Sequence, residues 1–172
     1  MQINHRIHVK DGEQCPSALD VQACISADRD MVPPIMALVV DVEKAHQQVP
    51  VAEEDWRHVA CSADPMPGSK QEQAGWNIIL KTVGTYGVAS ASWHWSRVAS
   101  LFQRIAYYVT GCRYLFRFAD DFMMLSSNST GVRFTLPILR FILLVGLCEI
   151  PLKWPKTRGG FESPICWLPL PL

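Results

Sequence analysis

Two adjacent acids, Asp120 and Asp121, lie between two apolar runs and are the residues best placed to do chemistry. Aromatic side chains alternate with others over residues 114–118, and residues 122–125 are all apolar. Two such runs around an Asp pair predict a β-hairpin with the acids at its tip, since Asp accepts turn conformations. Carboxylates beside large apolar side chains cost free energy unless a cation neutralises them. The pair therefore indicates either a solvated turn or a metal site.

A third acid, Asp41, follows the apolar run Ile35–Val40. A short apolar run preceded by two prolines suits a buried central strand. An Asp at the end of such a strand can cap the next turn, or it can contribute a carboxylate to a site. The strand alone leaves both readings open.

The hairpin resembles the catalytic hairpin of reverse transcriptases, in which an aromatic residue, any residue and two Asp lie between apolar strands. Phe118-Ala119-Asp120-Asp121 fits that pattern. Residues 41–50 resemble the family's first catalytic motif, in which a strand delivers an Asp and Ala plus an aromatic follow four residues on. The trailing Val49-Pro50 is also found in LTR-type and related retroelement polymerases. His46 stands where the family usually has Phe or Tyr against the sugar of the incoming nucleotide.

Residues 83–92 resemble the family's second motif, commonly Pro-Phe-Gly followed by small residues and a helix. Tyr86 takes the aromatic position and Gly87 the glycine, while Thr85 replaces the proline. A glycine lets the backbone approach a nucleotide closely, and an aromatic beside it can pack on a sugar or base.

Residues 148–157 resemble the fourth motif, in which a helix, a glycine and a strand lead to a Lys. Both Lys153 and Lys156 fit this position, and the place of Lys156 directly before Thr157 makes it the better match.

The four motifs occur in the family's order, and the resemblance implies a polymerase palm. That fold is α+β, with a small antiparallel sheet packed on two or three helices. Residues 35–160 would form the palm, with strand 35–41 beside hairpin 114–125. Residues 1–34 would be an N-terminal segment, a possible remnant of the fingers, and residues 161–172 a truncated primer grip.

The resemblance also implies the chemistry, which is RNA-directed DNA synthesis as part of a retroelement polyprotein. Asp41, Asp120 and Asp121 would hold two Mg²⁺ or Mn²⁺ ions, with Asp41 and Asp120 as the ligands of both. Lys156 would stabilise or protonate the leaving pyrophosphate. The partners would be deoxynucleoside triphosphates and an RNA or DNA template with its primer. The nucleotide pocket would contain His46, Tyr86 and Gly87.

Two alternatives stay open. Another palm-like nucleotidyl transferase, such as a cyclase, also pairs a strand Asp with a hairpin acid. A degenerate, non-catalytic retroelement remnant would keep the motifs without the activity. We further expect these residues alone to copy a template poorly, because only 40 residues precede Asp41 and the primer-grip-like segment stops at Leu172.

The composition fits a packed protein, with 49% hydrophobic and 19% charged residues in a chain of 172. Basic and acidic residues balance at 16 each, so net charge does not indicate a nucleic-acid partner. A local stripe of basic residues would nevertheless be enough to bind a nucleic acid.

The six cysteines are scattered without a Cys-x-x-Cys, which predicts mostly buried, reduced thiols in an intracellular protein of the cytoplasm or nucleus. The apolar window Phe134–Leu147 is too short to span a bilayer and predicts a buried helix and no membrane association.

The remaining segments position the motifs. Residues 1–30 show no sustained period, residues 53–59 predict a short helical turn, and residues 76–80 predict a strand. A helix should follow residue 132 and end at Gly146. A second helix should end near Thr110-Gly111 and bury one stripe of apolar residues, which are alternately four and three positions apart. That stripe comprises Ala91, Trp95, Val98, Phe102, Ile105 and Val109.

Overall fold

The computed structural model describes residues 11–12, 14–28, 35–63, 77–85, 87–127 and 132–160. The chain divides into two compact units. One consists of Met1–Gly12 and Ala45–Trp95, and the other of Glu13–Lys44 and Ser96–Leu172. The predictions for Tyr86 and for the primer-grip segment 161–172 lie outside the described residues.

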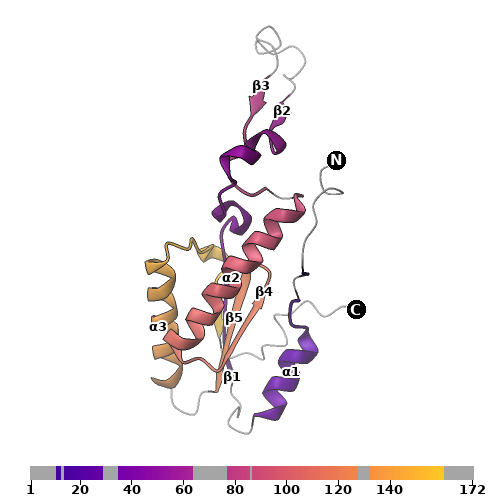
Figure 1. Ribbon diagram of the computed structural model, residues 1–172. Coiled ribbons are helices and arrows are strands. Elements are labelled where there is room, and N and C mark those ends of the chain that lie inside the picture. Colours follow the sequence, from indigo (N-terminus) through magenta and orange to yellow (C-terminus); the bar gives the residue numbers. More distant parts are fainter. Residues whose placement is uncertain are drawn as a thin grey trace. The chain divides into compact units, whose positions relative to one another are not determined.

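The second unit contains a four-stranded antiparallel sheet with the strand order β4-β5-β1-β6 (Figure 1). The strands are β1 (Ile35–Asp41), β4 (Tyr114–Phe118), β5 (Asp121–Ser127) and β6 (Arg158–Gly160). The helices of this unit are α1 (Ala18–Ala27), α3 (Val132–Leu147), the short η5 (Trp154–Lys156) and the part of α2 (Ala89–Thr110) from Ser96 on. The protein is therefore α+β, and the predicted strand at 35–41 and hairpin at 114–125 are confirmed as neighbours.

Helix α1 packs on one face of this sheet. Its Val21 is buried in a cluster with Ala37 of β1 and with Met123 and Leu125 of β5. Alternate residues of a strand point to opposite faces, so these odd-numbered positions belong to one face. Ser17 caps α1 in a capping box with Asp20. The sequence reading missed this helix, because its apolar positions form only a weak stripe.

The opposite face of the sheet carries an aromatic core. Phe122 of β5, Phe102 of α2 and Phe141 of α3 are buried, and their ring centroids lie 5.4–6.2 Å apart. The edge-to-face contacts of Phe102 with Phe122 and Phe141 add to the free energy that burial provides. Helices α2 and α3 are thereby fixed to β5.

The buried stripe of α2 differs from the prediction. Ala91, Trp95 and Phe102 are buried as expected, but Val98, Ile105 and Val109 are 40–47% exposed. Ala99, Ala106 and Thr110 are buried instead, since small side chains let a helix lie close to the element it covers. The buried residues of α2 are therefore mostly four positions apart. Hydrophobicity alone predicted some of these residues wrongly.

Three further predictions need correction. Helix α3 continues past Gly146 to Leu147, and Glu149 adopts the left-handed conformation beyond it. The cysteines are not mostly buried: among those described only Cys112 is, while Cys15, Cys61 and Cys148 are exposed. Only one side of α3 is buried, with Leu139 and Leu143 more than half exposed. Within the described ranges no helix is long and apolar enough to cross a membrane.

The first unit consists of short elements. Two 3-10 helices, η2 (Ala45–Gln48) and η3 (Glu53–His58), are followed by the strand pair β2 (Cys61–Ala63) and β3 (Asn77–Ile79). The predicted helical turn at 53–59 and the predicted strand near 76–80 are confirmed.

Candidate functional site

The acids predicted to act together come from the ends of two paired strands. In the antiparallel ladder of β1 and β5, Asp41 is the register partner of Asp121. Directly opposed residues of such a ladder have neighbouring side chains on one face of the sheet. Asp120 directly precedes Asp121 and lies in the turn. Its carbonyl oxygen accepts a hydrogen bond of 3.1 Å from the Val42 N–H. The strand end and the hairpin turn are thus joined directly.

The turn itself consists of Ala119 and Asp120, between the closing pair Phe118 and Asp121. Its left-handed residue is Ala119, with a φ of 54°, rather than either Asp. A residue with a Cβ disfavours this conformation, so neighbouring contacts must hold it.

The carboxyl of Asp121 is strongly perturbed. Burial and, to a smaller extent, the charges of Asp120 and Asp41 together raise its pKa to about 6, although the charge of Lys156 acts in the opposite direction. Like charges brought together in this way favour the neutral form of one acid or the arrival of a cation. A cation beside Asp121 would relieve this repulsion.

Lys156 supplies one cation to the site. Its Nζ lies 2.7 Å from Oδ2 of Asp41, which is 13% exposed, while the lysine side chain is 58% exposed. The hydrogen bond to Asp41 raises the pKa of Lys156, so the ammonium form is favoured. Of the two candidate lysines, this one contacts the carboxylate.

The backbone around η5 explains why Lys156 reaches Asp41. The Lys153 N–H donates to the carbonyl of Asp41 at 2.8 Å, and the Lys156 N–H donates to the carbonyl of Lys153 at 2.9 Å. Pro155 lies in the first turn of η5, where a missing N–H costs nothing. Lys153 thus anchors the segment through its backbone, and Lys156 presents its side chain.

The donor set suits Mg²⁺ or Mn²⁺, which prefer carboxylate oxygens. Within the described ranges, however, no group of three or more His, Cys, Asp or Glu side chains is arranged to hold a metal ion. Asp41 and Asp121 face each other, and the ammonium of Lys156 lies where a positive charge is needed. The residues fit a divalent cation by their chemistry, and binding one would require the Lys156 contact to Asp41 to change.

The residues predicted to hold the nucleotide belong to the other unit. His46 lies in η2 directly after the fully buried Ala45, and Gly87 is exposed in a turn with a φ of 85°. This positive φ accounts for the glycine. Their roles stay predictions.

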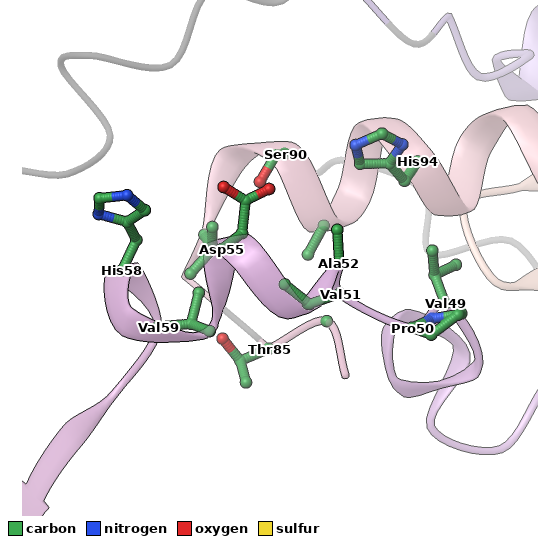
Figure 2. Close-up of a pocket in the computed structure, with 13 residues that line it drawn as sticks. Val49, Pro50, Val51, Ala52, Asp55, His58, Val59, Thr85, Ser90 and His94 are labelled. Atoms are coloured by element: carbon green, nitrogen blue, oxygen red, sulfur yellow. The ribbon is translucent and has the colours of Figure 1, made fainter. Parts of the chain in front are cut away.

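The first unit also contains a pocket of about 580 Å³ (Figure 2). Its walls are mainly apolar, and Asp55, His58, Ser90 and His94 add polar groups. The segments Val49–Ala52 and Gly84–Thr85 form part of the lining, but neither His46 nor Gly87 contributes to it. The pocket is therefore distinct from His46 and Gly87.

One buried charge near the acids was not singled out from the sequence. Arg117 of β4 is only 8% exposed and lies two residues before Ala119. Its position in an otherwise apolar strand, two residues after the buried Leu115, was the available signal.

Comparison of the sequence with models of known protein families and with curated proteins gives no match.

Proposed function

We propose that this chain is the palm of a reverse transcriptase, which extends a DNA primer on an RNA template by nucleotidyl transfer. One observation carries the proposal: Asp41 and Asp121 are register partners at the ends of β1 and β5, with Asp120 in the adjoining turn. Three carboxylates at one strand end are what this chemistry requires, and the order of the sequence motifs supports the same reading.

The three acids would hold divalent cations, with Asp41 and Asp121 opposite each other and Asp120 beside them. Two Mg²⁺ ions held by carboxylates neutralise charge on the attacking and leaving oxygens of a phosphoryl transfer. The partly buried position of Asp41 strengthens its interaction with any cation, because solvent screens it less.

Lys156 would serve the leaving pyrophosphate. Its long side chain is mostly exposed, and its pKa is raised, so it presents a full positive charge next to the acids. A lysine released from Asp41 could donate a proton or a hydrogen bond to the departing phosphate oxygen. In the same region, Lys153 and Arg158 add positive charge suited to a nucleic-acid backbone.

Primer extension tests the proposal. The purified chain would be supplied with a DNA primer on an RNA or a DNA template, deoxynucleoside triphosphates and Mg²⁺ or Mn²⁺. Low salt is preferable, because contacts to phosphates weaken steeply as salt increases. Because we expect these residues alone to copy a template poorly, the expected result is weak, metal-dependent incorporation that is lost in Asp41→Asn and Asp120→Asn.

Glu54→Gln is the matched control, since Glu54 is an exposed acid of η3 outside the site. Incorporation that survives in both aspartate variants would contradict the proposal. Metal binding without incorporation on either template would instead favour the degenerate remnant.

A further inference from the structure

Arg117 is a buried cation that is hydrogen-bonded both to the turn that carries the acids and to helix α2. It lies in β4 opposite Phe122, on the face of the sheet that α2 and α3 cover. A buried guanidinium is costly unless its donors are satisfied. The acceptors it uses therefore indicate what the charge does.

Three hydrogen bonds of Arg117 reach two different elements. Nη1 of Arg117 donates to the carbonyl of Ala119 in the turn at 3.1 Å. Nη2 donates to Oγ of Ser96 at 3.4 Å and to Oγ of Ser100 at 3.3 Å. The two serines are four residues apart on α2, so they lie on one face of the helix. The guanidinium thus ties the hairpin turn to α2.

The turn needs such a contact. Ala119 has a positive φ that a residue with a side chain disfavours, and its carbonyl is the acceptor for Arg117. The next carbonyl, that of Asp120, accepts from the Val42 N–H at the end of β1. A turn that relaxed would therefore move Asp120 away from β1 and disturb the pairing of Asp41 with Asp121.

We propose that Arg117 is a positioning residue: it holds the Ala119–Asp120 turn against α2 and thereby fixes the acids for the chemistry proposed above. Its role in catalysis rests on that proposed function, whereas its role in holding the turn does not. Arginine suits the task because its planar guanidinium offers several donors in a fixed fork, and lysine offers a single charged centre. In this role Arg117 acts on the acids through the turn.

Hydrogen exchange at single amides tests the positioning directly. The Val42 amide reports on the turn, since it donates to Asp120, and the adjacent Glu43 amide donates to Pro151 and serves as the internal control. In Arg117→Lys we expect Val42 to exchange about tenfold faster or more, as for a lost hydrogen bond to a charged group, with Glu43 unchanged.

The double variant Ser96→Ala/Ser100→Ala removes the acceptors on α2 and leaves Arg117 in place. It deletes only two hydroxyl groups, so it keeps the test valid if Arg117→Lys does not fold. We expect the same selective acceleration at Val42. Val42 exchange equal to wild type in the folded variants would overturn the proposal.

Primer extension by the same variants separates this inference from the proposed function. If wild type is active, we expect kcat to fall about tenfold in the variants with KM for the nucleotide unchanged, because only the acids move. Selective Val42 acceleration in a chain whose wild type incorporates no nucleotide supports the positioning role and contradicts the proposed function. Unchanged Val42 exchange and unchanged kcat in an active enzyme would overturn the positioning role alone.

Discussion

Asp41 and Asp121 face each other at the last register pair of the ladder between β1 and β5. Opposed like charges destabilise a ladder, and Lys156 offsets part of that cost through its 2.7 Å contact with Asp41. The chain therefore keeps two acids together at a position where apolar residues would be more stable. This arrangement makes specific predictions for pH, metal and charge substitution.

Asp121→Asn should stabilise the protein at neutral pH. The folded-state pKa of Asp121 is raised from 3.8 to about 6, so the folded state binds this proton more tightly than the unfolded state. Stability then decreases as pH rises through this window, and it stays reduced above it. After allowance for solvent screening, we expect a gain of about 1 kcal/mol for the variant above the window and none below about pH 4.

Urea denaturation of both proteins across this pH range measures the effect. Glu54→Gln, which neutralises an exposed acid in η3, should show no such pH-dependent gain. A gain for Asp121→Asn that is the same at every pH would show that the carboxyl is not the cause.

Mg²⁺ or Mn²⁺ should raise the thermal stability of the wild-type chain. A ligand that binds only the folded state stabilises it by about 2.7 kcal/mol at a hundred times its Kd. Asp41→Asn and Asp120→Asn should lose this gain because each removes a carboxylate from the site. Thermal melts with and without metal provide the measurement, and an equal rise in wild type and Asp120→Asn would exclude a shared site.

Lys156→Met should lower the melting temperature in the absence of divalent metal and have little effect when metal is saturating. The ammonium of Lys156 neutralises Asp41 in the metal-free protein, and a bound cation would take over that role. Lys153→Met is the matched control, since the contact of Lys153 with Asp41 is through its backbone N–H. A loss of stability that metal does not reverse would mean that Lys156 and the metal do not share a site.

The strands that carry Asp41, Asp120 and Asp121 were predicted well from the sequence. Strong local signals located β1, which has an apolar run ending at Asp41, and the hairpin, which has alternation on both sides of an acid pair. Their pairing could be expected only from the family resemblance, because nothing in one strand specifies its neighbour. The register was not predicted, although the apolar pattern restricts it, since slipping by one residue would turn every apolar side chain of β1 to the other face.

Other features depend on tertiary contacts and left little trace in the sequence. Helix α1 has a single buried residue, Val21, so its stripe is too weak to detect. The buried face of α2 includes Ala99 and Ala106, whose small size matters more than their hydrophobicity. The hydrogen bonds from Arg117 to Ser96 and Ser100 join residues about 20 positions apart in the sequence. Neither an arginine nor a serine indicates by its type which distant residue it will contact.

The last prediction contrasts two glycines. A Cβ at Gly84 would lie 2.3 Å from the backbone oxygen of His46, and this atom cannot move without shifting η2. Gly84 also donates its N–H to the carbonyl of Val49 at 2.9 Å, which keeps the two segments close. Gly84→Ala should therefore destabilise the protein by about 1–3 kcal/mol through overpacking.

Gly146→Ala should instead stabilise the protein. A Cβ at Gly146 meets nothing within 4 Å, and the residue lies within α3, where alanine is favoured over glycine by about 0.5–1 kcal/mol. Urea denaturation of the two variants beside wild type measures both effects. Because both variants replace glycine by alanine, opposite changes in the free energy of unfolding would be due to the close approach of residues 46 and 84. A Gly84→Ala protein as stable as wild type would contradict that packing.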